Sequence, residues 1–295
     1  MKQLKPDFTT ITQELIGLTT DKNPNVPGEF KAFNHMVGPP MHPATGEPSD
    51  VFDYQEEDEE AWNKHHKLIL NKSRKIGATE TALRIIAFNC FNGKYNDHRV
   101  MIVAGNKQEV ANRFIERFIA IFGKGFTDGD GKWWAIEDII IDRKSSRIQM
   151  WNGIIIQAYP ANESVRGEEN VICVFMSECA FINLLDDSKV YNALHPNVAN
   201  IGHADFIMES TPNGKRGFFW ELFTDEGNEY HKLEQPYTRA MGQLLDENTV
   251  INERNNAKID FEQEYNCKFT TSLSAAFKED EVKYTVKDIN TYDDI

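Results

Sequence analysis

Short apolar runs alternate with helically spaced apolar residues along most of this chain. Continuous apolar runs are typical of strands buried in a parallel sheet, and apolar residues three and four positions apart are typical of amphipathic helices. The runs predict strands at Lys67–Asn71, His98–Gly105, Val171–Met176 and Ala204–Ser210, and within the late segment "YHKLEQPY". The spacing predicts helices at Thr79–Phe91, within "NKQEVANRFIERFIAIFGK" and at Asn183–Leu194. This alternation predicts an α/β fold in which helices cover both faces of a mostly parallel sheet.

The two ends of the chain depart from this alternation. Residues 1–50 are rich in Pro, Gly, Thr and Asn, which predicts an N-terminal arm extended over the surface with a short helix at Ile11–Leu18. The alternating core is expected to occupy residues 51–240. Residues 241–295 are expected to form a short C-terminal extension, helical over "TVINERNNAKIDFEQEYNCKF" and polar at its end. Within the core, Asn152-Gly153 predicts a hairpin turn between two short strands.

Composition narrows the class of protein. The chain has 295 residues, 40% of them hydrophobic, which is enough for a large core. Its formal net charge of −14 argues against tight solitary binding to nucleic acid, although a local basic patch can still contact it. The four cysteines form no C-x-x-C pair. Cys173 and Cys179 flank an apolar run, so we expect these two to be core residues in a reducing compartment and not metal ligands. No apolar run approaches the length of a membrane span, and we expect a soluble, intracellular protein.

The segment "LILNKSRKIGATETALRIIA" has the strand, loop and helix order of a phosphate-binding loop. In the pattern G-x-x-x-x-G-K-[ST], Gly77 and Thr79 match, whereas Ala78 stands at the lysine position and Lys72 at that of the first glycine. Such loops bind phosphate through backbone N–H groups, and the following hydroxyl binds Mg²⁺, which is the role expected of Thr79. A lysine at the start of the loop can reach across it, so Lys72 is predicted to supply the displaced charge. A basic turn before an ordinary helix would give the same pattern, and this segment alone leaves both interpretations open.

Two later strand ends carry polar residues that an ATPase would use. "VICVFMSECAF" is an apolar strand followed by Ser177 and Glu178, where P-loop enzymes place a Walker B aspartate for Mg²⁺ and a glutamate that orients water. "IMESTPNG" ends in Ser210, Thr211 and Pro212, and hydroxyls at the carboxyl end of a parallel strand face the ligand crevice. A buried strand with a polar end, and ordinary turn chemistry, are the simpler interpretations of the two segments.

In their order and spacing, these three segments resemble the ATPase part of the large terminase subunit of tailed double-stranded DNA bacteriophages. The resemblance spans roughly Val51 to Phe277. It implies a P-loop NTPase fold of the ASCE type. It also implies that Tyr54 and Gln55 hold the adenine, and that "KSRKIGATE" is a phosphate loop with its lysine, Lys72, at the start. The nucleotide-contacting set implied for this loop is Lys72, Ser73, Arg74, Lys75, Gly77, Ala78 and Thr79.

The resemblance also implies catalytic and coupling roles. Glu178 falls on the catalytic glutamate, and Arg166 falls on an arginine that senses or stabilises the γ-phosphate charge. Arg74 falls on a loop arginine that many members carry. Ser210, Thr211 and Pro212 fall on the coupling motif that links ATP hydrolysis to DNA movement.

Two departures from the family pattern stand out. Thr79 and Ser177 are the residues expected to face Mg²⁺. Because Ser177 replaces the Walker B aspartate, the ion would lose a carboxylate from its outer shell. Asp186 or Asp187 is the candidate that would compensate. Family members also continue into a nuclease with clustered metal-binding carboxylates. This chain stops about where that domain would begin, and its terminal acids follow no strand pattern, so we expect no nuclease activity from it.

The resemblance therefore implies an ATP- and Mg²⁺-dependent motor that drives double-stranded DNA into a procapsid. The implied partners are DNA, the portal protein, the small terminase subunit and further copies of the chain in a ring on the capsid. We expect it in the host cytoplasm and away from membranes. Two alternatives remain open at this point: a helicase-like ATPase of recombination, and a nucleotide-binding scaffold subunit whose catalysis has decayed, as Ala78 and Ser177 would allow.

Overall fold

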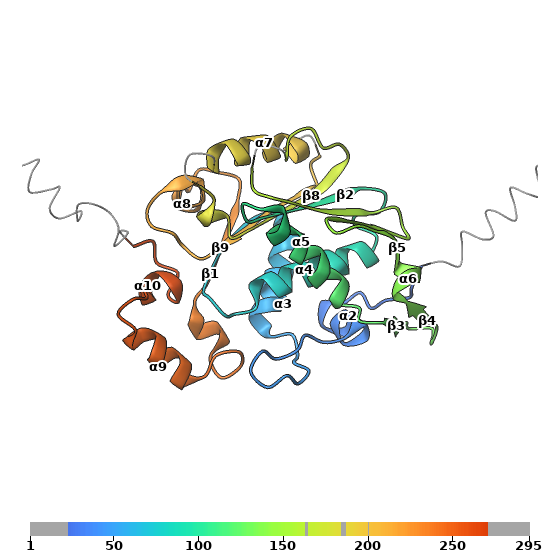
Figure 1. Cartoon of the computed structure of the whole chain (residues 1–295), viewed down its shortest axis with the longest axis horizontal. Coiled ribbons are helices and arrows are strands. Elements are labelled where there is room, and N and C mark those ends of the chain that lie inside the picture. Colours follow the sequence, from blue (N-terminus) through green and yellow to red (C-terminus); the bar gives the residue numbers. More distant parts are fainter. Residues whose placement is uncertain (1–22, 163–164, 184–186, 200, 271–295) are drawn as a thin grey trace, which may run out of the picture.

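An eight-stranded sheet runs through the computed structural model, which describes residues 23–162, 165–183, 187–199 and 201–270 (Figure 1). Its strand order is β10-β1-β9-β8-β2-β7-β6-β5. The strands are β1 Lys67–Lys72, β2 Arg99–Ala104, β5 Ile140–Arg143, β6 Arg147–Met150, β7 Ile155–Tyr159, β8 Val171–Ser177, β9 Asp205–Ser210 and β10 His231–Gln235. The predicted helix at Ile11–Leu18 and the polar end of the chain lie outside the described residues.

The sheet is mostly parallel, as predicted. Strands β10, β1, β9, β8, β2 and β7 pair in parallel, and β6 and β5 add an antiparallel edge. Asn152 and Gly153 form the predicted turn between β6 and β7. A separate two-stranded ribbon, β3 Gly125–Thr127 with β4 Trp133–Ala135, was not predicted. The order places β9 between β1 and β8, so residues at the ends of these three strands meet at one edge.

Helices cover both faces of the sheet, which confirms the predicted α/β class. Helices α3, α4 and α5 lie on one face and α7 lies on the other (Figure 1). The α-helices are α2 Phe30–Val37, α3 Asp53–His65, α4 Ala78–Phe91, α5 Gln108–Ala120, α6 Ile136–Ile139, α7 Asp187–Ala199, α8 Gly217–Thr224, α9 Glu247–Asn255 and α10 Phe261–Glu264. Two short 3₁₀ turns are η2 Cys179–Phe181 and η3 Tyr237–Ala240.

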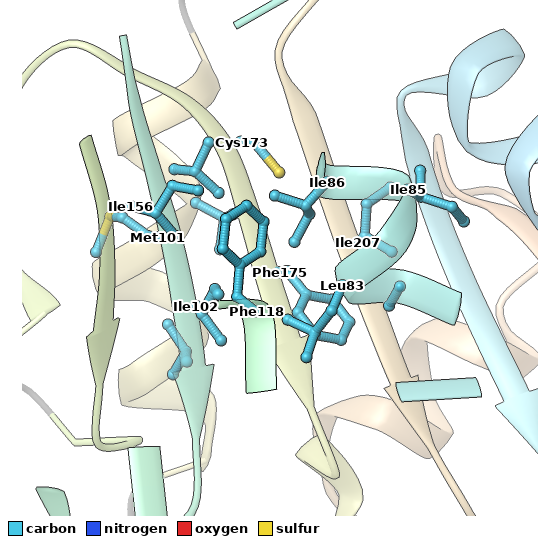
Figure 2. Packing of buried hydrophobic residues seen from close by; sticks show 14 of the residues in the cluster. Leu83, Ile85, Ile86, Met101, Ile102, Phe118, Ile156, Cys173, Phe175 and Ile207 are labelled. Atoms are coloured by element: carbon cyan, nitrogen blue, oxygen red, sulfur yellow. The ribbon is translucent and has the colours of Figure 1, made fainter. Parts of the chain in front are cut away.

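The main core lies between the sheet and the helices α4 and α5. Ile86 of α4 and Phe118 of α5 pack over Ile102 of β2 and Phe175 of β8, and all four side chains are buried (Figure 2). Every residue of β8 is buried because both faces of this strand are covered, which explains its unbroken apolar run. Full burial of each such aliphatic or aromatic side chain stabilises the fold by about 1.5–3 kcal/mol.

The sequence predicted that residues 1–50 form an extended arm. The structure differs, because part of this region is a packed helix. Helix α2 packs into the main core through Phe30, Phe33 and Val37. The side chain of Arg84 on α4 ties α2 down by donating to Asn34 Oδ1 at 2.8 Å, and it is itself buried. The i, i+3, i+7 spacing of the three apolar residues is a helical signal. This signal was missed because it is short and is flanked by Pro and Gly residues, which predict loops.

The C-terminal region is also more broken than predicted. Two short helices, α9 and α10, replace one helix over "TVINERNNAKIDFEQEYNCKF". Each begins at its own aspartate cap: Asp246 accepts from Thr249 N at 2.9 Å, and Asp260 accepts from Gln263 N at 3.1 Å. A capping aspartate favours a helix start at its own position, so Asp260 interrupts the longer helix.

Three further features concern the cysteines, membrane-spanning helices and metal ligands. Cys90, Cys173, Cys179 and Cys267 are all buried free thiols, which confirms the predicted core position of Cys173 and Cys179. In the described part of the chain, no helix is both long and apolar enough to cross a membrane. Nor do the described His, Cys, Asp and Glu side chains include any group of three or more arranged to hold a metal ion.

Candidate functional site

Two cavities meet at the loop that joins β1 to α4. One is apolar, has a volume of about 1020 Å³ and is lined by Val51, Phe52 and Leu244 among others. The other is polar, has a volume of about 610 Å³ and is lined by the loop itself together with Glu178 and Thr211. The two cavities adjoin at the loop, because both are lined by Lys75, Gly77, Glu80 and Arg117.

The loop reaches its shape through Gly77, which begins α4. Its φ of 78° lies in the left-handed region that favours glycine. A Cβ at this position would lie 3.1 Å from Gln55 Nε2 and 3.2 Å from Leu244 Cδ1. Both the backbone conformation and the close neighbours therefore favour glycine here. The turn directs the N-terminus of α4, with its unpaired N–H groups, toward the polar cavity, which is an environment that suits an anion.

Lys72 lies at the end of β1 and lines the polar cavity, where its ammonium contacts Glu178. Its Nζ lies 2.5 Å from Glu178 Oε1, and its side chain is only 7% exposed. Burial alone would lower the pKa of Lys72, but the carboxylates of Glu178 and Glu209 outweigh that effect and raise it above its usual value. Lys72 therefore carries a positive charge at neutral pH in the place where a phosphate would need one.

The other two loop cations are held by the C-terminal helices. Arg74 Nε lies 2.5 Å from Glu264 Oε2 of α10, and Lys75 Nζ lies 2.9 Å from Glu253 Oε1 of α9. Both residues still line the polar cavity. Lys72 is therefore the loop lysine whose ammonium group lies closest to the catalytic candidate Glu178.

Two further loop residues of the predicted nucleotide-contacting set, Ser73 and Ala78, are buried. Ser73 is fully buried, and its N–H donates to Gln235 O at 2.8 Å. Ala78 is buried as the first residue of α4. Ala78 belongs to a second apolar cluster, which also contains Tyr54, Leu70 and Ile76.

Glu178 and the predicted coupling residues come into contact. Glu178 follows β8 in a left-handed conformation, φ 53°, that turns its partly exposed carboxylate toward the polar cavity. Ser210 Oγ lies 3.5 Å from Glu178 Oε2 and accepts from Ala180 N at 3.2 Å. Thr211 lines the polar cavity, and Asn213 Nδ2 donates to Ala180 O at 3.0 Å. Pro212, between them, is buried. The segment after β9 is therefore bonded to the turn that carries Glu178.

A buried glutamate that the sequence analysis did not single out lies behind this site. Glu209, at the end of β9, accepts from Thr79 Oγ1 at 2.7 Å and from Ser177 Oγ at 2.8 Å. It is 1% exposed, and burial raises its pKa while the charge of Lys72 partly offsets that shift. A signal was present in the sequence, because Glu209 directly follows the apolar residues of the strand "DFIMES", and an acid is costly to bury there without a partner.

The two residues predicted to hold the adenine, Tyr54 and Gln55, lie in different environments. Gln55 lines the apolar cavity beside Phe52. Tyr54, by contrast, is not among the described residues that line either cavity, because its ring is buried and its hydroxyl donates to Ile76 O of the loop at 2.7 Å. Tyr54 therefore contacts the loop from behind, and Phe52, next to it in the sequence, lines the apolar cavity with an aromatic ring.

Arg166 and Asp187, which the sequence placed at the site, are found elsewhere. Arg166 is exposed in a turn and is not among the described residues lining either cavity, whereas Arg117 of α5 lines both and lies 3.2 Å from Glu80. Asp187 does not compensate for Ser177, because its Oδ2 accepts from Phe218 N at 3.1 Å and caps α8. Asp186 lies outside the described residues.

A family model and several solved structures match this chain. Residues 69–284 match the family described as "Terminase large subunit, T4likevirus-type, N-terminal". The match covers well over half of the chain and includes the loop, Glu178 and the segment after β9.

Among solved structures, the chain is similar to the large terminase of bacteriophage HK97, with a TM-score of 0.63 and 12% identity over 81% of this chain and 54% of that one. It is also similar to the large terminase of a thermophilic bacteriophage in complexes with ADP and with ATP-γ-S, each with a TM-score of 0.55 and 12% identity over 74% of this chain and 53% of that one. These likenesses show the fold. The chain spans about half the length of these terminases.

Proposed function

We propose that this chain, which belongs to the family of T4likevirus-type terminase large subunits and matches their N-terminal part, is the ATP-hydrolysing motor that drives double-stranded DNA into a bacteriophage procapsid. The observation that carries the proposal is that Lys72, Thr79 and Glu178 all line one polar cavity at the N-terminus of a helix. The nucleotide complexes of a terminase with the same fold support ATP as the ligand.

Each side chain has a task in ATP hydrolysis. The ammonium of Lys72 neutralises charge on the terminal phosphates, and the N–H groups at the start of α4 bind their oxygens. The carboxylate of Glu178 orients and polarises the attacking water. Gln55 and Phe52 hold the base in the apolar cavity, which adjoins the polar one. An arginine from a neighbouring copy of the chain stabilises the transition state, a contribution of about 10³- to 10⁵-fold in other NTPases.

The residues present fit a magnesium ion. Mg²⁺ prefers oxygen ligands and is usually held by one or two protein groups together with substrate phosphates. Thr79 offers a hydroxyl oxygen in the polar cavity, and Ser177 and buried carboxylate oxygens lie directly behind it. When bound, Mg²⁺ would withdraw charge from the phosphate oxygens that are displaced in hydrolysis. Thr79 would hold the ion, and Ser177 would face its outer shell.

The contacts after β9 support a link between hydrolysis and DNA movement. Ser210 and Asn213 bond to the turn that carries Glu178, so a shift of that turn acts on the segment Ser210–Pro212. DNA, the portal protein, the small terminase subunit and a ring of further copies are the proposed partners. The host cytoplasm is the proposed compartment. Because the net charge is −14, basic residues next to Ser210–Pro212, such as Arg216, are the better candidates to contact DNA.

Family membership argues against a helicase-like ATPase of recombination. A scaffold subunit with decayed catalysis predicts a different experimental result. The test is ATP hydrolysis by the full chain, alone and assembled on its portal with DNA, compared with Glu178→Gln in the same assembly. We expect turnover that the assembly stimulates and that Glu178→Gln abolishes. Binding of ATP without turnover in the assembly would support the scaffold instead.

A further inference from the structure

We propose that Glu209 replaces the absent Walker B aspartate, so that the Mg²⁺–nucleotide is positioned by a cluster of Thr79, Ser177 and Glu209 drawn from α4, β8 and β9. This proposal rests on the proposed function and names the group that completes its metal site. Glu209 acts through Thr79 and Ser177 and is a positioning residue.

The sheet register brings Glu209 to the required place. In the pairing of β8 with β9, Ser177 lies beside Glu209, and in the pairing of β1 with β9, Leu70 lies beside Glu209. Neighbouring strands are about 4.8 Å apart, and side chains beside each other in register point to the same face. A glutamate has one methylene more than an aspartate. From the next strand it can therefore bring a carboxylate close to the place that an aspartate at position 177 would fill.

The hydrogen bonds give Glu209 a definite effect on Thr79. A hydroxyl has one proton to donate and two lone pairs. Thr79 donates that proton to Glu209 Oε1 at 2.7 Å, so its lone pairs remain for a ligand in the polar cavity. Ser177 donates to the same oxygen at 2.8 Å. Glu209 thus fixes both hydroxyls in the orientation that a cation requires.

The second oxygen of Glu209 is a separate indication of a charged ligand. Glu209 Oε2 is buried and has no hydrogen-bond partner among the described residues. Buried carboxylate oxygens in folded proteins are rarely left unpaired. Three other cations line the polar cavity, and each is paired with its own acid: Arg74 with Glu264, Lys75 with Glu253 and Arg117 with Glu80. Glu178 and Glu209 therefore place two carboxylates near one remaining ammonium, that of Lys72, which leaves room in the local charge balance for a cation.

This arrangement also explains why the described residues contain no preformed metal cluster. Mg²⁺ in a nucleotide site takes most of its ligands from phosphates and water. The protein then needs one hydroxyl and an acid that orients it. Loss of such outer-shell partners typically lowers metal affinity about 10- to 100-fold.

The experiment measures how much Mg²⁺ strengthens nucleotide binding. The affinity of the full chain for ATP-γ-S is determined with Mg²⁺ and with EDTA, and the ratio of the two affinities is the magnesium enhancement. We expect Glu209→Gln, which keeps the shape of the side chain, to reduce the enhancement about 10- to 100-fold while the affinity in EDTA stays unchanged. We expect the double variant Ser177→Asp/Glu209→Gln to regain most of it, because the aspartate returns the carboxylate to β8.

Rescue separates a metal role from a purely structural one, since an acid on β8 would not repair general damage to β9. Circular dichroism and thermal unfolding check that each variant is folded. If Glu209→Gln does not fold, the folded double variant decides: a wild-type enhancement supports the proposal and a lost one overturns it. If folded Glu209→Gln has an unchanged magnesium enhancement, the proposed role of Glu209 is overturned and the proposed function is not. A wild-type chain that binds no ATP-γ-S in either condition overturns the proposed function and this proposal with it.

Discussion

The ammonium of Lys72 and the carboxylate of Glu178 form an ion pair at 2.5 Å that joins the ends of β1 and β8 across the intervening β9. The pair connects the residue proposed to bind phosphate with the residue proposed to orient water. Phosphate oxygens in the polar cavity would compete with Glu178 for Lys72. The arrival of the nucleotide would therefore free the glutamate for its catalytic task.

Replacing Lys72 by alanine should weaken ATP binding about 10- to 100-fold, because a charge-assisted contact with phosphate is worth about 1.5–3 kcal/mol. Lys75→Ala is the matched control in the same loop. Its ammonium is bound to Glu253 on α9, so its removal should have a smaller effect. Equilibrium ATP binding and steady-state hydrolysis measure both variants. Wild-type behaviour of Lys72→Ala would show that the loop is aligned wrongly.

Glu178→Gln should retain Mg²⁺–ATP binding and lose turnover by about 10²- to 10⁴-fold, because an amide cannot accept a proton from water. Binding should be retained because the substitution removes a competitor for Lys72. The control is Glu109→Gln on the exposed start of α5. Single-turnover hydrolysis on the assembled motor provides the measurement. Robust turnover by Glu178→Gln would point to another acid.

Asp205→Ala should destabilise the fold by about 3–5 kcal/mol, the usual cost of breaking a buried ion pair. Asp205 is fully buried at the start of β9, where it accepts from Trp62 Nε1 at 2.8 Å and pairs with Lys94 at 2.8 Å. Asp142→Ala, which breaks a more exposed pair with Arg147, should cost under about 1 kcal/mol. Urea unfolding measures both. Equal effects of the two variants would contradict the larger stabilisation expected from the buried pair of Asp205 with Lys94.

The stability of the protein should fall between about pH 4 and pH 8 through Asp58. Burial raises the pKa of Asp58 to about 8; the amide of Gln235 opposes the shift, and Glu57 and Glu209 add to it. The folded state therefore holds this proton more tightly than the unfolded state. Its stabilising contribution is complete below the unfolded pKa and is lost as pH rises through the folded one.

Asp58→Asn, which stays neutral at every pH, should remove this dependence. The gain over wild type should be larger at about pH 8 than at about pH 5, on the order of a few kcal/mol, since one pKa unit corresponds to about 1.4 kcal/mol. Urea unfolding at the two pH values measures it. Parallel stability curves for the two proteins would show that Asp58 does not titrate in this range.

The sequence predicted those parts of the site that depend on the pattern of neighbouring residues along the chain. The strand before Lys72, the helix after Gly77 and the strand before Glu178 were all found where their patterns placed them. Helix α2 was missed because three apolar residues are a weak signal amid Pro and Gly, although Phe33 is completely buried. Tyr54 was assigned to the base by resemblance, yet the structure buries its ring behind the loop, which no local pattern could reveal.

What the sequence alone determined is the chemistry available: a loop lysine, a hydroxyl at Thr79 and an acid after a buried strand. What only the tertiary structure decided is which groups meet. Thr79 and Glu209 are 130 positions apart, and Lys72 and Glu178 are 106 positions apart. Their contacts depend on β9 lying between β1 and β8. The apolar pattern of a strand predicts that the strand is buried, but it does not predict which strand lies beside it. Strand order is decided by the packing of the whole sheet.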